Sequence, residues 1–128
     1  MNEKVLIIGA GHGLSTSIAR LFAAKGMKVG LAARNIEKLA ALADEIGAST
    51  FTCNASDPDA VVGLCKAFDT DIGCPDILVY NPSSRVRGPI TEIDAIATKD
   101  AILVSAYGAF LAAQQAAIRM LKAGSGTM

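Results

Sequence analysis

Apolar runs and amphipathic stretches alternate along the whole chain. The apolar runs have the length of buried strands and cover residues 5–8, 27–33, 49–53 and 76–80. Apolar residues at helical spacing predict helices that begin near residues 14, 35, 57 and 94 or 99, the last running to about residue 122. Strands and helices that alternate in this way form parallel β-α-β units. We therefore predict a doubly wound α/β fold with a parallel sheet of strand order 3-2-1-4 and helices on both faces.

Local capping signals mark the ends of these helices. Gly26 and Gly47 follow the last periodic residues of the first two helices, as glycine commonly does at a helix C-terminus. Asn35 is predicted to cap the second helix. Asp57 is predicted to cap the third, with Pro58 at its first position.

The last predicted helix is apolar almost all the way round. Its two apolar stripes are Ile102, Ala106, Phe110, Ala113 and Ala117, and Leu103, Tyr107, Leu111, Gln114 and Ile118. A helix of this kind must bury two sides. One side is expected against the sheet, and the other against a further helix of the chain or a second subunit. We predict a homo-oligomer that forms through the helix between Ile102 and Ile118.

The first apolar run ends in a turn with three glycines, Gly9, Gly11 and Gly13. A strand, a glycine turn and a helix aim the free amides and positive dipole end of the helix at a phosphate. Gly9 allows the tight turn, and Gly13 lets a pyrophosphate approach the backbone. We predict that the three glycines and Leu14, at the start of the helix, contact the cofactor. His12 is a candidate phosphate donor, with an exposed loop histidine as the alternative. A turn without ligand also fits, because the strict G-x-G-x-x-G spacing fails at Leu14.

The length, charge and residue content of the chain exclude several kinds of protein and site. The 128 residues suit one domain, residues 1–128, and 12 Lys and Arg balance 12 Asp and Glu, so nothing in the charge suggests nucleic acid or an acidic membrane surface. The first apolar run is too short for a membrane span or a signal peptide, and a cytoplasmic protein is expected. The three cysteines form no C-x-x-C pair and are read as reduced thiols. His12 is the only histidine, which excludes a histidine-based metal site or a Ser-His-Asp triad, and we predict no metal.

Four stretches of the chain match known motifs in order and spacing. They are residues 8–15 on Thr-Gly-x-x-x-Gly-x-Gly, residues 31–35 on a second-strand end, residues 53–57 on Asp-Val-Thr-Asp, and residues 78–83 on Leu-Val-Asn-Asn-Ala-Gly. The departures from these motifs include Ile8, Ser15, Asn54 and Tyr80. On these motifs the whole chain resembles the N-terminal, cofactor-binding half of the short-chain dehydrogenase/reductase family, a truncated Rossmann-type fold.

The end of the second strand indicates which nicotinamide cofactor the chain prefers. In the dinucleotide fold an acidic residue at this place binds the ribose hydroxyl of NAD, whereas an arginine suits the 2′-phosphate of NADP. The residues here are Ala33 and Arg34. Arg34 can hold a phosphate with a charge-assisted fork, so we predict NADP over NAD. The alternative is a solvated arginine in front of a helix.

The resemblance implies further cofactor contacts. Asn54 would lie near the adenine amino group and Ala55 beside the ring, although a strand-end Asn satisfied by a turn fits Asn54 nearly as well. Asn81 and Pro82 would pass close to the cofactor ribose. These assignments depend on the resemblance and not on the spacing of the residues alone.

The resemblance also implies hydride transfer by a Tyr-x-x-x-Lys pair and an orienting Ser. The chain has no such pair, because Tyr80 is followed by Ser84 and Tyr107 by Leu111. The assisting Asn of the family falls at Ser105. Residues 124–128 are expected to approach a fifth strand, with the catalytic half of the family beyond them. Two functions remain open: an NADP-dependent oxidoreductase whose catalytic segment is absent, acting on an unknown carbonyl or alcohol, and a non-catalytic nucleotide-binding or interaction module.

Overall fold

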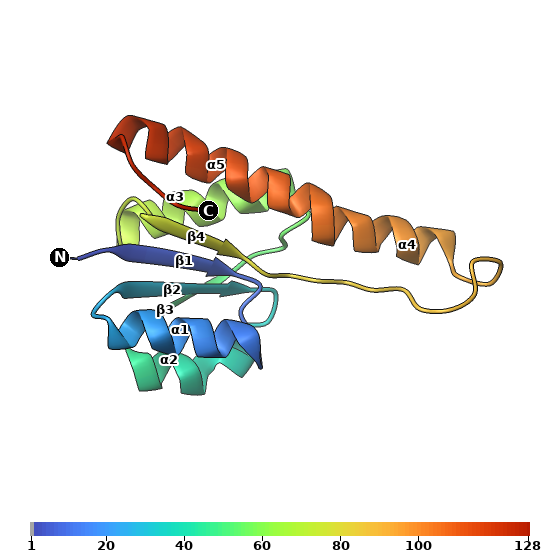
Figure 1. The fold of residues 1–128 in the computed structure, drawn as a ribbon, viewed down its shortest axis with the longest axis horizontal. Helices are drawn as coiled ribbons and strands as arrows, with labels where there is room; N and C mark the ends of the chain where they lie inside the picture. The colour runs from blue at the N-terminus through green and yellow to red at the C-terminus, as the bar shows by residue number, and fades with distance from the viewer. Residues whose placement is uncertain (1) are drawn as a thin grey trace.

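A computed structural model describes residues 2–128, and its centre is a four-stranded parallel sheet (Figure 1). The strands are β1 (Lys4–Ile8), β2 (Lys28–Ala33), β3 (Ser49–Thr52) and β4 (Ile77–Tyr80). Their order in the sheet is β3-β2-β1-β4, which confirms the predicted topology. From β1 the chain adds β2 and β3 on one side of the sheet and then crosses to add β4 on the other side. Ligands bind at such a switch point in open α/β sheets.

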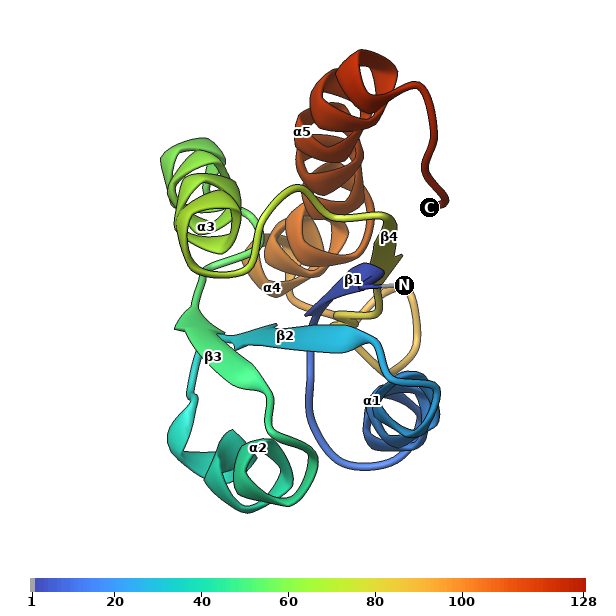
Figure 2. The same cartoon turned by 90° about the vertical axis from the view of Figure 1, so that its left-hand side faces the viewer.

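Helices cover both faces of the sheet (Figure 2). The helices and helical turns are α1 (Leu14–Ala24), η1 (Glu37–Leu39), α2 (Ala40–Ile46), α3 (Pro58–Asp71), α4 (Ala95–Ile102), η2 (Leu103–Tyr107) and α5 (Gly108–Ala123). Helices α1 and α2 lie on one face, and α3 and α5 on the other. The predicted doubly wound arrangement is therefore confirmed.

Most of the predicted helix ends agree with the structure. Gly26 has φ 82° and follows Lys25, the C-cap of α1, and Gly47 has φ 68° directly after α2. The Asp57 side chain caps α3 by accepting a hydrogen bond from the Asp59 amide. Asn35 makes the same kind of bond, because its side chain accepts from the Glu37 amide two residues on, but the 3₁₀ turn η1 begins after Ile36, one residue later than predicted.

The two cores meet at β1, whose side chains alternate between them. Val5 and Ile7 pack with α1 and α2, whereas Leu6 and Ile8 pack with α3 and α5. All four side chains are at most 2% exposed, which explains why the strand reads as an unbroken apolar run. Gly30 in β2 leaves room for the Phe68 ring, since a Cβ there would lie 2.6 Å from it.

A π turn, η2, interrupts the long helix and shifts its apolar pattern. The buried residues are Ala101, Gly108, Leu111, Ala112, Ala116 and Met120. They match neither predicted stripe, and the second stripe combines buried Leu111 with exposed Tyr107 and Ile118. The extra residue of a π turn rotates everything after it around the helix axis, and an uninterrupted helical period cannot describe that.

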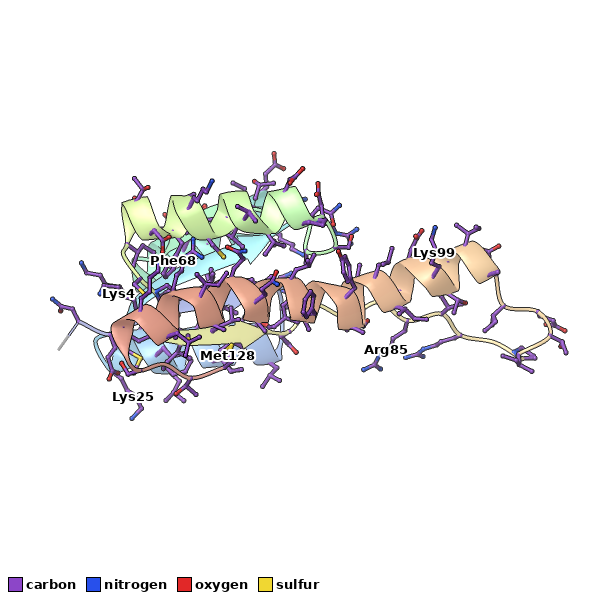
Figure 3. The ribbon with its side chains drawn as sticks, turned by 90° about the horizontal axis from the view of Figure 1, so that it is seen from above. Lys4, Lys25, Phe68, Arg85, Lys99 and Met128 are labelled. Atoms are coloured by element: carbon purple, nitrogen blue, oxygen red, sulfur yellow. The ribbon has the colours of Figure 1, made fainter. Side chains whose placement is uncertain are left out.

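Much of the long helix is exposed. Residues 81–94 and α4 extend beyond the sheet, so that Arg85 and Lys99 lie far from Lys4 and Phe68 (Figure 3). The span Ala95–Ala123 is long and apolar enough to cross a membrane by length and composition alone. Within this fold its inner side packs against α3 and β4, as expected of a helix that covers a core.

Residues after α5 return to the sheet beside β4. Thr127 forms a parallel bridge with Ile77, in which the Leu78 amide donates to Thr127 at 2.9 Å and the Thr127 amide donates to Asp76 at 3.0 Å. This single bridge is the start of pairing on the far side of β4. It agrees with the expected approach to a fifth strand.

Candidate functional site

A cleft of about 720 Å³ lies at the carboxyl ends of the strands, on the side where α/β sheets bind ligands. One wall is the glycine turn after β1 with the end of β4 that lies against it, and the opposite wall comprises parts of α4 and η2. Eight of the predicted cofactor residues line it: Gly9, Gly11, His12, Arg34, Asn54, Ala55, Asn81 and Pro82. Gly13 and Leu14 lie at the start of α1 outside the lining, and the Leu14 side chain is 64% exposed.

Gly9 is required by the way the chain crosses itself. Its φ is +83°, and a Cβ there would lie 2.3 Å from the Pro82 backbone nitrogen and 2.7 Å from the Asn81 carbonyl carbon. The amides of Gly9 and Ala10 both donate to the Ala32 carbonyl, at 2.9 and 3.1 Å. Gly9 therefore brings the turn against the ends of both β2 and β4.

Ser15 fixes the glycine turn from behind. Its side chain is buried, and its hydroxyl donates to the Gly9 carbonyl at 3.2 Å and accepts from the Asn81 side-chain amide at 2.9 Å. Nearby, the Thr16 hydroxyl donates to the Gly11 carbonyl. From the sequence Ser15 was only a departure from a glycine motif, and nothing local in the sequence indicates that Asn81, 66 positions away, is its partner.

The N-terminus of α1 is open to a ligand. Gly13 stands at the cap position with φ 86°, no side chain caps the helix and its first turn carries no acidic residue. A Cβ on Gly13 would meet no protein atom within 4 Å. Amides at a helix N-terminus have no partner within the helix and carry the positive end of its dipole, so this surface suits an anion.

Cationic side chains gather at the β2 end of the cleft. Arg34 and Lys38 both line it, together with His12, and the Lys38 ammonium lies 3.8 Å from where a Cβ of Gly11 would stand. Across residues 2–128 the ion pairs are Arg20 with Glu45 and Arg119 with Asp69, so Arg34 and Lys38 lack a carboxylate partner there. Lys38 was missed by the sequence reasoning, although it stands only four positions after Arg34.

The Asn54 side chain satisfies a local turn. Its Oδ1 accepts from the Ser56 amide at 3.2 Å and from the Ser56 hydroxyl at 2.9 Å. The alternative of a strand-end Asn satisfied by a turn is therefore realised, while the residue still lines the cleft. Its Nδ2 group remains a donor for a base within the cleft.

Ser105 lies in η2, outside the cleft lining. Its hydroxyl accepts from the Ser84 amide and donates to the Ser84 carbonyl, each at 3.3 Å. Ser84 does line the cleft, together with Ser83, Asp100 and Val104. At the position of the assisting Asn, Ser105 thus connects the loop after β4 to η2.

Two thiols and one tyrosine hydroxyl of the core on the α3 and α5 side have raised pKa values. Burial raises the pKa of the Cys53 thiol to about 11 and also raises the pKa of Cys65. Burial, and then Cys53, raises the pKa of the Tyr80 hydroxyl. Neutral thiols are poor nucleophiles, so these groups serve packing and hydrogen bonding.

Comparisons with known proteins agree with this geometry. The family model for short chain dehydrogenase matches residues 3–128. Gluconate 5-dehydrogenase of Gluconobacter oxydans (strain 621H) is 30% identical over 96% of this chain and 50% of its own length.

Solved structures give the same result. The chain is similar to a variant of the actinorhodin polyketide ketoreductase with NADPH (TM-score 0.92, 26% identity, 98% of this chain and 51% of that one). It is also similar to a short-chain type dehydrogenase/reductase from Mycobacterium marinum (TM-score 0.88, 30% identity, 98% and 53%). The chain spans about half the length of these relatives. The fold, the motifs and these matches together show that the chain belongs to the short-chain dehydrogenase/reductase family of oxidoreductases.

Proposed function

We propose that the cleft binds NADP and that this chain is the cofactor-binding part of an NADP-dependent oxidoreductase acting on a carbonyl or alcohol. The observation that carries the proposal is the charge at the end of β2, where Arg34 directly follows Ala33 and lines the cleft. Asp100 is the one carboxylate in the described lining, and it stands on α4 rather than beside β2. A 2′-phosphate at the β2 end therefore meets cations and no acidic residue.

Arg34 and Lys38 supply complementary interactions for that phosphate. A guanidinium offers a planar fork of donors, and an ammonium offers a compact point charge. Charge-assisted hydrogen bonds of this kind contribute about 1.5–3 kcal/mol each. NADH lacks the 2′-phosphate, so its affinity should depend little on either side chain.

The glycine turn would hold the diphosphate of the cofactor. The open start of α1 and the free space at Gly13 suit an anion held by backbone amides. Asn54 and Ala55 would border the adenine, and Asn81 and Pro82 the ribose at the β4 side. The bound nicotinamide supplies hydride transfer, and these residues bind and orient it.

The experiment compares NADPH and NADH binding to the wild-type chain, Arg34→Ala and Lys38→Ala by calorimetry. Arg34→Ala should raise the Kd for NADPH about 10- to 100-fold and leave the Kd for NADH within about twofold. Lys38→Ala should act in the same direction with a smaller effect. Arg85→Ala is the matched control, because Arg85 is an exposed arginine outside the cleft lining. Equal NADPH affinity of wild type and Arg34→Ala would reject the 2′-phosphate role.

The second proposal is that the 128-residue chain binds cofactor without turnover. No Tyr-x-x-x-Lys pair occurs in its sequence, and burial raises the pKa of the partly buried Tyr80 hydroxyl. This observation favours the binding module as the function of the chain by itself. NADPH oxidation in the presence of a panel of aldehydes and ketones should remain at the background rate. A rate above background that Tyr80→Phe or Tyr107→Phe abolishes would assign an acid to this chain instead.

We also propose that the chain self-associates through the outer side of the long helix. Exposed apolar side chains there include Ile102 at 58%, Phe110 at 56% and Leu121 at 82%. Contiguous exposed apolar surface of this kind is typical of an interface. Light scattering should give more than one chain per particle for wild type and a single chain for Phe110→Glu. A monomeric wild type at high concentration would contradict it.

A further inference from the structure

Tyr80 and the π turn η2 meet at the wall of the cleft that is formed by α4 and η2. In a regular α-helix the Gly108 amide would donate to the Val104 carbonyl. Here it donates to the Leu103 carbonyl, one residue further back, and the Val104 carbonyl accepts the Tyr80 hydroxyl. At the Val104 carbonyl, the Tyr80 hydroxyl at the end of β4 thus replaces the Gly108 amide as the hydrogen-bond donor.

Gly108 makes this contact sterically feasible. A Cβ on Gly108 would lie 2.1 Å from the Tyr80 hydroxyl oxygen and 2.6 Å from the Ala55 carbonyl oxygen. Gly108 is buried and its φ is −60°, so its backbone conformation does not require glycine. The close approach of the helix to Tyr80 and to residue 55 does require it.

The π turn sets the position of side chains in the cleft. Val104, whose carbonyl accepts the Tyr80 bond, lines the cleft, and Asp100 lines it one turn earlier. Ser105 in the same turn holds Ser84 of the facing loop by two hydrogen bonds of 3.3 Å. A return of η2 to regular α-helix would rotate this part of the wall, because it removes the extra residue of the turn.

From these contacts we infer that Tyr80 is a positioning residue for the cofactor: its bond to Val104 holds the π turn and, through it, the wall against which the nicotinamide half of the dinucleotide lies. The inference rests on the proposed cofactor site. With the 2′-phosphate at Arg34 and the diphosphate at the glycine turn, the remaining half of the molecule extends toward Ser84 and Val104. The adenine half lies at the β2 and β3 ends, beside Arg34, Asn54 and Ala55.

The test uses two ligands, NADPH and 2′,5′-ADP, which is the adenine half with its 2′-phosphate. In Tyr80→Phe the Kd for NADPH should rise about fivefold or more, while the Kd for 2′,5′-ADP should stay within twofold of wild type. Amide hydrogen exchange at residues 103–108 should accelerate in the same variant, because the turn loses its support from β4. Tyr107→Phe removes a hydroxyl from an exposed tyrosine of the same turn, and it should change none of these quantities.

The outcomes separate the two proposals. If wild type binds both ligands and Tyr80→Phe weakens neither, or weakens both equally, the positioning role is overturned while the cofactor site stands. A wild-type chain that binds neither ligand overturns the cofactor site, and the positioning role with it. Loss of NADPH affinity alone, together with faster exchange at residues 103–108, supports the role of Tyr80.

Discussion

The two walls of the cleft are held in place in different ways. The glycine turn is fixed by backbone geometry, with Gly9 against Pro82 and the buried Ser15 bonded to both Gly9 and Asn81. The opposite wall stands on an extended helix and is held by two side-chain links, Tyr80 with Val104 and Ser84 with Ser105. The first wall is held by the sheet and by one buried side chain at the start of α1. The second depends on a few bonds near solvent, and it is the part that we expect to move.

Substitution of Gly9 should break the first wall with the largest effect of all. Gly9→Ala combines a positive φ with a Cβ 2.3 Å from the Pro82 backbone, which a side-chain movement cannot relieve. We expect a loss of more than about 3 kcal/mol in the free energy of unfolding, measured by urea denaturation. Gly26→Ala is the matched control, because Gly26 has φ +82° and no neighbour within 4 Å. It should cost only about 1 kcal/mol. If Gly9→Ala and Gly26→Ala lose the same free energy of unfolding, the loss comes from backbone strain and not from the contact with the Pro82 backbone.

Removal of the Ser15 hydroxyl should have a smaller effect on the same wall. Ser15→Ala leaves the Asn81 amide and the Gly9 carbonyl without their partner, which should lower the free energy of unfolding by about 1–3 kcal/mol. Ser17→Ala, at an exposed position two residues on, should change it by less than about 0.5 kcal/mol. A Ser15→Ala chain as stable as Ser17→Ala would mean that the backbone alone fixes the turn.

Alkaline pH should weaken the region beneath the second wall. Burial raises the pKa of Cys53 from 9.0 to about 11, so the folded state binds this proton more tightly than the unfolded state does. The resulting stabilisation is complete below about pH 9 and is lost as pH rises toward 11. It amounts to on the order of 1–2 kcal/mol. Cys53→Ala should flatten the decline of Tm between these pH values, whereas Cys74→Ala should not. If the Tm of wild type and of Cys53→Ala falls equally with rising pH, ionisation of Cys53 is not the cause of the decline.

Much of the fold follows from local patterns in the sequence. The apolar runs, Gly26, Gly47 and Asp57 with Pro58 predict the elements and their ends, because strand burial and helix caps depend on neighbouring residues. The π turn could not be predicted in this way. It depends on a contact between Tyr80 and Gly108, which only the folded sheet brings together. The stripes drawn through residues 102–118 also miss the buried side of α5 itself, where Ala112 and Ala116 are buried and Phe110 and Ile118 are exposed.

The candidate site likewise contains residues that local sequence patterns predict and residues that they do not. The glycine turn and Arg34 are recognisable because the motif and its spacing express a local geometry. Ser15 and Lys38 are not, since their roles arise from Asn81 and from the folding of η1 back toward Gly11. Residues that look like departures from a motif can therefore be parts of the site.

The most direct measurement is an NMR titration of the full chain with NADPH, followed by backbone amide shifts. The account predicts saturable shifts at Gly11, Gly13 and Arg34, with smaller ones at Val104. A second depression, formed by Asp69, Cys74, Arg119 and Lys122, provides the internal comparison, and its amides should stay unchanged. Saturable shifts confined to that second depression, or no saturable shifts at any ligand concentration, would contradict the proposal that the glycine turn and Arg34 bind the cofactor.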